Sequence, residues 1–485
     1  MPQTQQRASA TSPPLHLVFV PFLARSHFAP LAAKAAAAAR GEHGVSTTAA
    51  IVTTPHFAAL SPASVPVHVA DDFRCPGGHE DFSLLPDGDE SSSSAPAFFA
   101  AAEAALAPAL AAALRAHGGD GAPAAVVSDA VLHWAPRVAR ECGVPHVTFH
   151  TIGAFAAAAM VALHLQRPSE AASFPDGDPF LLPGGFPRHV KLSRAQVNEE
   201  ALAHLPIFRA AEAESSAVAF NSFSALEADF AAYYQAHLAG RPKKVFLVGP
   251  TRAGAGASPR ASGAGAERDP ILRWLDGRCA GSVVYVCFGS TCALGEGQLR
   301  ELGAGLHASG RPFLWVIPAA GGGGGGAARE ERASSHGMVV AGRWAPQAEI
   351  LAHGAVGGFV THCGWNSAME AVCAGVPLAT WPLRAEQFVN EAFLVEVLRV
   401  GVRVREEEAE DDVEAVVPAG AVARAVGRLM GEGRGEEEAA RRGRARELGA
   451  AARAAVAEGG SSCGDWARLV EELKALHGGK SDLAM

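Results

Sequence analysis

Residues 344–387 read WAPQAEILAHGAVGGFVTHCGWNSAMEAVCAGVPLATWPLRAEQ, in which apolar runs alternate with a helical pattern. Two short apolar runs, 357–362 and 376–382, flank a helical pattern at 364–375. Two strands joined by a helix form a βαβ unit, in which the strands run parallel and ligands bind outside their carboxyl ends. Polar residues follow the first strand at once, as His-Cys-Gly-Trp-Asn-Ser. We therefore predict a parallel sheet whose carboxyl edge carries a binding site.

The same alternation of apolar strands and helical stretches extends over the whole chain. In the second half we expect strands at 282–289, 311–318 and 336–342 and helices at 296–309 and 347–353. In the first half we expect strands at 15–21, 46–54, 124–129 and 144–150 and helices at 28–40 and 131–142. Continuously apolar strands are typical of parallel sheets covered on both faces. Because 485 residues exceed what one core holds, the sequence predicts an α/β protein of two doubly wound, Rossmann-like domains.

Changes in composition mark the predicted domain boundaries. Residues 251–269 are nearly all Gly, Ala, Ser and Pro with scattered charge, which is typical of a flexible linker. We predict an N-terminal domain over 1–250, a C-terminal domain over 270–460, and a final helical segment, 461–485, that packs back on the N-terminal domain. Six consecutive glycines, 321–326, indicate a loose surface insertion, because no apolar helix follows them as a phosphate loop would require.

Bulk properties exclude several other classes of protein. The net charge is −9 with 41 Lys and Arg and no basic run, so nucleic acid is not an expected partner. The polar N-terminus and the short apolar runs predict neither a signal peptide nor a membrane span. Eight cysteines without a CxxC pair are typical of a reduced, cytoplasmic protein that lacks a structural metal site.

The predicted helix at 364–375 opens an anion site, because unpaired N–H groups and the helix dipole attract phosphate at a helix N-terminus. Glu370 lies four residues after Asn366 and shares its helix face, where a carboxylate can accept both hydroxyls of a ribose. The residues placed to bind a diphosphate at this edge are Ser290, His362, Trp365, Asn366 and Ser367.

Residues on either side of this helix extend the predicted site. Trp344 offers a flat ring on which a uracil can stack, and Ala345 and Gln347 can supply donors and acceptors for the edge of the base. Glu386 and Gln387 follow the next strand and can hydrogen-bond the hydroxyls of a sugar. Each residue alone has a structural interpretation, as a core Trp, a satisfied His or a capped helix start. Their combination at these spacings favours a site for a UDP-sugar.

Residues 344–387 resemble the donor-binding box of the plant family of small-molecule UDP-glycosyltransferases. The matching anchors are W-x-P-Q, H-C-G-W-N-S, E, G-V-P and E-Q, and a looser similarity covers the rest of the chain, including YVCFGS (285–290), FLWV (313–316) and AEQFVNE (385–391). The resemblance implies the GT-B fold, in which an acceptor-binding N-terminal domain faces a UDP-sugar-binding C-terminal domain across a cleft. Gln387 at the end of the box implies glucose rather than galactose.

The resemblance also implies a catalytic base in the first domain. His27 follows the first strand in FLARSHFAP, which is similar to the family's GHxxP turn with Ser26 in place of Gly. Asp129 ends the strand 124–129, and in the family the matching Asp orients the His, like the His–Asp half of a hydrolase triad. Thr151 is expected to approach the donor sugar. The structural alternatives are a surface His at a helix start and an Asp that caps a helix.

Together these residues predict an inverting O-glucosyltransferase that uses UDP-glucose. No cofactor and no metal are expected, since no carboxylate pair with ligand geometry lies near the donor box. We expect a monomer that acts on a small apolar acceptor, such as a flavonoid or another phenolic, with terpenoids and hormones as alternatives. The acceptor contacts are predicted at His27, Phe149 and Ala385, and other aromatic residues predicted near the pocket are Phe22, Phe28, Phe155 and Phe180.

Two other classes of function were weighed against this one. A nicotinamide-dependent oxidoreductase needs a GxGxxG turn after the first strand, where this chain reads PFLARSH. A sugar-nucleotide-binding protein without activity would require damage to the base or to the donor box, and both sets of residues are intact.

Overall fold

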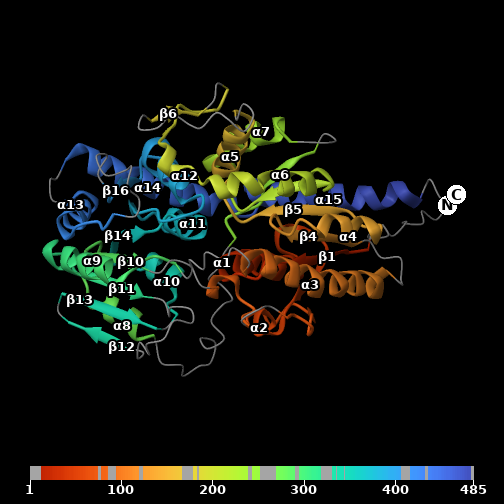
Figure 1. Cartoon of the computed structure of the whole chain (residues 1–485), viewed down its shortest axis with the longest axis horizontal. Coiled ribbons are helices and arrows are strands. Elements are labelled where there is room, and N and C mark those ends of the chain that lie inside the picture. The colour runs from red at the N-terminus through yellow and green to blue at the C-terminus, as the bar shows by residue number, and fades with distance from the viewer. Residues whose placement is uncertain are drawn as a thin grey trace, which may run out of the picture.

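The computed structural model (Figure 1) describes most of the chain. The described residues are 13–74, 78–85, 94–118, 124–166, 179–182, 185–238, 243–251, 269–289, 294–317, 330–334, 336–342, 344–405, 415–431 and 435–481. Most of the predicted linker, the glycine run 321–326 and Ser290 lie outside these ranges.

The N-terminal half of the described chain is built on a seven-stranded parallel sheet with the strand order β3-β2-β1-β4-β5-β8-β9. Its strands are β1 (Leu15–Val20), β2 (Thr47–Thr53), β3 (Val67–Val69), β4 (Ala124–Asp129), β5 (His146–His150), β8 (Ala217–Phe220) and β9 (Val245–Leu247). Its helices are α1 (Arg25–Ala39), α2 (Pro55–Ala58), α3 (Ser94–Gly118), α4 (Ala135–Glu141), α5 (Ala154–Gln166), α6 (Glu199–Ala213) and α7 (Ser224–Ala236). A small hairpin, β6 (Phe180–Leu181) with β7 (Lys191–Leu192), lies above α5 in Figure 1.

The C-terminal half contains a second seven-stranded sheet with the order β12-β13-β11-β10-β14-β15-β16, in which only β12 is antiparallel to its neighbour. Its strands are β10 (Val283–Cys287), β11 (Phe313–Ile317), β12 (Glu330–Ala333), β13 (Gly337–Ala341), β14 (Val356–Thr361), β15 (Leu378–Thr380) and β16 (Gly401–Arg403). Its helices are α8 (Pro270–Asp276), α9 (Glu296–Ala308), α10 (Gln347–Ala352), α11 (Trp365–Ala374), α12 (Gln387–Ala392), α13 (Ala419–Met430) and α14 (Glu436–Ala455). Two doubly wound sheets confirm the predicted fold class.

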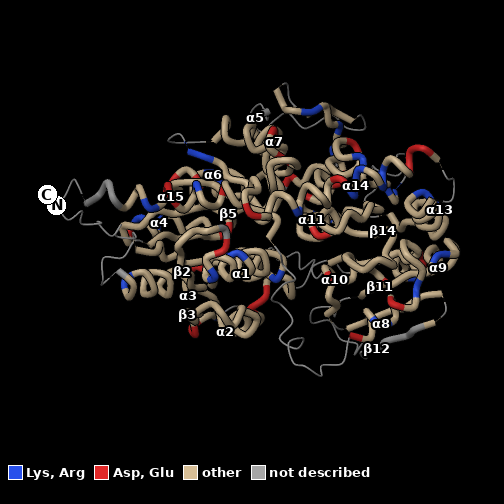
Figure 2. Tube along the Cα trace, turned by 180° about the vertical axis from the view of Figure 1, so that it is seen from behind, with Lys and Arg blue, Asp and Glu red and all other residues tan. Residues whose placement is uncertain are grey.

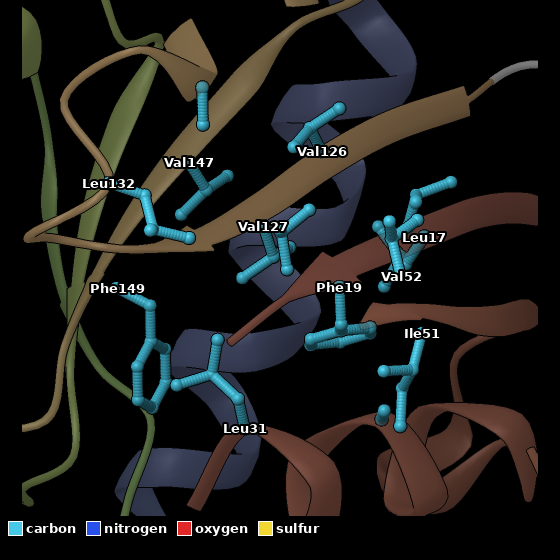
Figure 3. Packing of buried hydrophobic residues seen from close by; sticks show 14 of the residues in the cluster. Leu17, Phe19, Leu31, Ile51, Val52, Val126, Val127, Leu132, Val147 and Phe149 are labelled. Carbon is cyan, nitrogen blue, oxygen red and sulfur yellow. The ribbon is translucent and has the colours of Figure 1, made fainter. Parts of the chain in front are cut away.

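The apolar strand runs form the cores because parallel strands are buried on both faces. In the first sheet, Leu17, Phe19, Val126 and Val147 have no exposed surface. Figure 3 shows how they interlock with Leu31 of α1 and with the neighbouring strands. Charged side chains of both signs are interspersed over the two halves of the described chain (Figure 2).

The final helix, α15 (Ser461–Ser481), packs on the sheet of the N-terminal half, although it follows the C-terminal half in sequence. Trp466 is 2% exposed, and the Nζ atom of Lys34 in α1 lies 4.1 Å from the centre of its ring. Lys34 also donates to the Val248 carbonyl, at 3.1 Å. The Asp465 carboxylate accepts from the Leu247 amide at 2.9 Å, next to the end of the edge strand β9. This helix therefore ties α1 to β9.

Several elements were missed at the level of sequence. The helices α3, α6 and α7 and the short strands β3, β8, β9 and β16 were not predicted. Among the described helices, α3 is long and apolar enough to cross a membrane by length and composition. In the fold it lies against β1, β2, β3 and β4, and its buried residues Phe98, Leu106 and Leu110 belong to the core.

Replacing Trp466 with Ala should lower the free energy of unfolding by about 3–5 kcal/mol, because it empties a filled space between α15 and the sheet. Leu476→Ala on the same helix is the control. Leu476 is 48% exposed, so its loss should cost no more than about 0.5 kcal/mol. Urea unfolding followed by fluorescence and by circular dichroism measures both. Equal midpoints for the two variants would show that α15 does not stabilise the N-terminal half.

Candidate active site

The strand order of the first sheet reverses between β1 and β4, and this switch point is where doubly wound sheets bind ligands. Both predicted catalytic residues lie there, because His27 is in the first turn of α1, after β1, and Asp129 ends β4. The Nδ1 atom of His27 is 2.9 Å from Oδ2 of Asp129 and 3.0 Å from the hydroxyl of Thr151. With Nδ1 bonded to a buried carboxylate, the geometry leaves Nε2 as the nitrogen that can accept a proton.

The environment of His27 sets its affinity for protons. Burial lowers its pKa, but the charge and hydrogen bond of Asp129, together with the charge of Glu386, outweigh burial and raise the pKa above the ordinary value. Asp129 is 1% exposed and also accepts from the Val131 amide at 3.2 Å, so it is fixed in place. Thr151 is the residue expected to approach the donor sugar, and the structure places its hydroxyl beside the base.

The second sheet has an equivalent switch point between β10 and β14, and the start of α11 lies after β14. His362 is wedged between Gly289 and Gly364, since a Cβ atom at these glycines would lie 2.7 Å and 2.5 Å from its ring. The backbone of Cys363 has φ 66°, a left-handed turn that directs the chain from the strand into the helix. Two glycines are thus required to seat His362 beside the N-terminus of α11.

His362 is a neutral hydrogen-bonding group near neutral pH. Burial, with a contribution from the charge of Arg384, lowers its pKa to about 4. A neutral imidazole still donates from one nitrogen, so it can bind an anion without first taking up a proton. Ser290, the partner predicted for the same phosphates, lies outside the described residues.

Glu370 is held by a chain of hydrogen bonds that starts at Gln347. The side-chain amide of Gln347 donates to Oε2 of Glu370 at 2.8 Å and to the hydroxyl of Ser367 at 3.0 Å. Its own oxygen accepts from the hydroxyl of Tyr285 at 3.1 Å. Burial raises the pKa of Glu370 to about 7, although the hydrogen bond from Gln347 acts to lower it. A carboxylate so placed suits neutral hydroxyl donors, as a ribose would present.

The predicted base-binding residues differ in exposure. Trp344 is 65% exposed, so a face of its ring is open for stacking. The Arg25 guanidinium carbon lies 5.9 Å from the centre of that ring, and Arg25 also pairs with Asp81 at 3.5 Å. The side chain of Ala345 is 5% exposed and belongs to the core of the second sheet, so Ala345 can serve a ligand through its backbone.

The loop before α12 carries the predicted sugar ligands. Ala385 has φ 54°, and this left-handed backbone turns Glu386 into the site. The charge of Glu386 acts on His27, which places the carboxylate near the base. Burial raises the pKa of Glu386. The side-chain oxygen of Gln387 accepts from the amides of Leu383 and Arg384, at 2.9 and 3.0 Å, so it shapes the loop.

The two halves of the chain touch at this site. The Asn366 side-chain amide donates to the carbonyl of Ser26, the residue before His27. The indole N–H of Trp365 donates to the Asn221 carbonyl at 2.9 Å, and its ring is 4% exposed. Trp365 and Asn366, which were predicted to bind the donor, therefore join the start of α11 to the N-terminal half. The backbone amides of this first turn remain the predicted phosphate ligands.

Hydrophobic residues beside the loop line a small, partly open hollow. It lies between α5 and α6 of one half and Ala385 and Glu386 of the other. Phe149, predicted to contact the acceptor, has no exposed surface and packs in the core near Leu31 and Leu132 (Figure 3), so that prediction is wrong. The pocket is lined by Met160, Leu163, Val197, Asn198, Ala201, Leu202, Ala385, Glu386 and Val389.

Comparison with known proteins identifies the family. The family described as UDP-glucoronosyl and UDP-glucosyl transferase matches residues 272–418. UDP-glycosyltransferase 73C4 of Arabidopsis thaliana is 34% identical over 96% of this chain and 98% of its own length. The chain belongs to the plant UDP-glycosyltransferase family. UDP-glycosyltransferase 73B4 of the same plant is 36% identical over 72% of this chain and 74% of its own length.

Solved structures of plant UDP-glycosyltransferases share the whole fold. UGT73P12 of Glycyrrhiza uralensis, complexed with glycyrrhetinic acid 3-O-monoglucuronide, superposes with a TM-score of 0.79 at 29% identity, over 97% of this chain and 98% of that one. UGT2 of Phytolacca americana, complexed with UDP-2fluoro-glucose and pterostilbene, gives a TM-score of 0.74 at 27% identity, over 95% and 100%. These relatives confirm the GT-B fold, and this UDP-glycosyltransferase acts on small molecules.

Sequence reasoning missed several residues at this site. Asn390 is 1% exposed, and its side-chain amide donates to the Cys363 carbonyl at 2.9 Å and lies 3.4 Å from Glu386. Its position four residues after Glu386 on a helix could have revealed it. Asn221 follows β8, a strand that was not recognised, so its place at the carboxyl edge went unseen. Among the described residues, no three His, Cys, Asp or Glu side chains are grouped so as to hold a metal ion.

Asp129→Asn should move the acidic limb of the kcat/KM profile to lower pH. Asp129 raises the pKa of His27, and the base works in its neutral form, so removing the charge lets His27 lose its proton at a lower pH. Transfer rates measured across pH for the variant and the unmodified enzyme test this. A limb that stays in place would show that another group controls it.

The affinity for UDP should rise as pH increases through about 7, because only the ionised form of Glu370 can accept both ribose hydroxyls and its pKa is about 7. Glu370→Gln keeps the shape and should bind UDP more weakly, without this pH dependence. Isothermal titration calorimetry with UDP at several pH values measures both effects. Unchanged affinity in the variant would remove Glu370 from the donor site.

Proposed function

We propose that this UDP-glycosyltransferase transfers glucose from UDP-glucose to a hydroxyl of a small apolar acceptor, with inversion of the anomeric configuration. The observation that carries the proposal is the contact of Asn366 with the carbonyl of Ser26. It brings the phosphate-binding turn of one half against the His27–Asp129 pair of the other. A donor held at α11 would then present its anomeric carbon toward the base.

The proposed reaction is a single in-line displacement. His27 accepts the proton of the acceptor hydroxyl at Nε2, and Asp129 stabilises the resulting imidazolium through Nδ1. The acceptor oxygen forms a bond to the anomeric carbon as the bond from that carbon to the diphosphate oxygen breaks. Negative charge develops on the departing UDP, where the first amides of α11 and the neutral His362 can stabilise it. We propose that no metal takes part.

The ligands of the donor are assigned by position. We propose that Trp344 stacks on the uracil, Glu370 binds the ribose, and Glu386 and Gln387 bind the glucose. The carboxylate of Glu386 is close enough for its charge to act on His27, which supports a sugar position beside the base. Asn390, which contacts Glu386, would keep that carboxylate in place.

The apolar pocket supports the proposed class of acceptor. Leu163, Val197, Leu202 and Val389 line it with hydrocarbon side chains, and Glu386 adds a polar group to the lining. We propose that the acceptor is a flavonoid or another phenolic. We also propose that the enzyme is monomeric and cytoplasmic. A terpenoid or hormone acceptor is the alternative. The relative UGT73P12 was solved with a glycyrrhetinic acid glucuronide, and UGT2 was solved with pterostilbene, so related proteins bind both chemical classes.

A nicotinamide-dependent oxidoreductase has no support in this site. The turn after β1 holds Phe22 and Leu23, both buried, where a dinucleotide fold needs glycines that let the pyrophosphate approach the backbone.

The test is UDP release from UDP-glucose, UDP-galactose and UDP-glucuronic acid with panels of phenolic, terpenoid and hormone aglycones. His27→Ala should lower kcat by about 10²–10⁴-fold and leave the Kd for UDP nearly unchanged, because a general base acts only on the chemical step. His68→Ala, in the exposed edge strand β3, is the control and should keep full activity. Full transfer by the His27 variant at saturating donor would overturn the proposed mechanism.

A further inference from the structure

Asn221, at the carboxyl end of β8, uses every polar group it has in contacts with other segments. Its backbone N–H donates to the His150 carbonyl at 3.1 Å. Its carbonyl accepts from the indole of Trp365 at 2.9 Å, and its side-chain oxygen accepts from the amide of Thr251 at 2.8 Å. Its side-chain N–H₂ donates to Oδ1 of Asn366 at 3.5 Å. The residue is 2% exposed, so these partners stand in for water.

These contacts connect three parts of the molecule. Trp365 and Asn366 begin the helix at the donor site, and Thr251 is the last described residue before the segment that leads to the second half. Asn366 also donates to the carbonyl of Ser26. A continuous path of hydrogen bonds therefore runs from Asn221 through Asn366 to the residue that precedes the proposed base.

The backbone around Asn221 leaves it no freedom to move. A Cβ atom on Gly249 would lie 2.5 Å from the Asn221 side-chain oxygen and 2.6 Å from the Ser222 amide. The ring of Trp365, whose indole bonds the Asn221 carbonyl, is itself held against Gly153, where a Cβ atom would lie 2.8 Å from it. The side chain of Asn221 is thus clamped by packing as well as by hydrogen bonds, which is how a group can be held within a fraction of an ångström.

We propose that Asn221 is a positioning residue that fixes the donor helix α11 against the N-terminal half, so that the anomeric carbon faces His27. The inference rests on the proposed function, because it assigns a role within the same transfer reaction. Asn221 itself touches neither substrate. It acts through Asn366 and Trp365, and its effect is on the alignment of the two reactants, which dominates the rate of displacement reactions between bound groups.

Asn221→Asp tests the proposal with almost no change of shape. The carboxylate still accepts from Thr251, but its second oxygen now faces Oδ1 of Asn366, and two acceptors repel. If Asn366 turns its amide to donate to Asp, its own oxygen faces the Ser26 carbonyl. Either arrangement breaks the path to the base. Asn221→Ala removes the amide group altogether.

Thr47→Val is the matched control. Thr47 is buried in the same half and donates to the Ala38 carbonyl at 2.8 Å, so its loss costs a comparable internal hydrogen bond away from the site. With UDP-glucose and the phenolic acceptor that reacts fastest, Asn221→Asp should lower kcat by at least about tenfold. Its Kd for UDP and the pKa of the acidic limb should match those of the control. Thermal melts of the two variants should agree within a few degrees.

Three results would overturn the inference. The first is a kcat for Asn221→Asp and Asn221→Ala within threefold of the control, on the order of what an exposed substitution does. The second is a Kd for UDP that rises by the same factor as kcat falls. Asn221 would then contribute to binding of the donor, and not only to its alignment with His27. The third is a kcat lowered equally by Thr47→Val, which would indicate general loss of structure.

Amide hydrogen exchange decides the question without catalysis. The amides of His27, Phe28 and Ala368 are bonded within the first turns of α1 and α11. In Asn221→Asp they should exchange faster in both turns at once, and in Thr47→Val they should not. If the unmodified enzyme transfers no sugar from any UDP-sugar, the proposed function fails, and unchanged exchange in both turns would show separately that Asn221 does not join the halves.

Discussion

The carboxyl edges of two parallel sheets have to face each other at a fixed separation, and the hydrogen bond from Asn366 to the Ser26 carbonyl marks where they meet. Polar residues of each sheet lie at its switch point, because the loops after neighbouring parallel strands diverge there and leave room for a ligand. Neither edge is a complete site. The base lies on one sheet, the anion-binding turn on the other, and the loop with Glu386 reaches across to act on the base.

The surroundings of the two site histidines shift their pKa values in opposite directions. Burial lowers the pKa of both His27 and His362, yet the Asp129 carboxylate raises the pKa of the first above its ordinary value, while the charge of Arg384 lowers that of the second further. The first is suited to take a proton and the second to bind an anion while neutral. Glu370 is oriented by Gln347, which is itself bonded to Tyr285, so its carboxylate is placed for hydroxyl groups that enter the site.

The sequence predicts the fold class well because parallel strands are continuously apolar and their ends carry the polar motifs. It also brings His27 and Asp129 to one edge, and their atoms are in contact. It fails where long-range packing decides. The strand β8 is only four residues long, so Asn221 was not placed at the edge. Phe149 lies near the end of a predicted strand and was expected to reach the pocket, but β5 is an interior strand of its sheet and its side chains are buried. That Trp365 and Asn366 bind the other half depends on how two domains dock, which no local pattern encodes.

The stereochemistry of the product reports on how the base and the donor are arranged. If one displacement by an acceptor oxygen activated at His27 accounts for the reaction, the α-linked glucose of UDP-glucose must appear as a β-glucoside. Proton NMR of the anomeric signal in the product distinguishes the two linkages. Only the β-linked product is expected. An α-linked product would require a second displacement or another face of attack, and would contradict the arrangement of base and donor described for this enzyme.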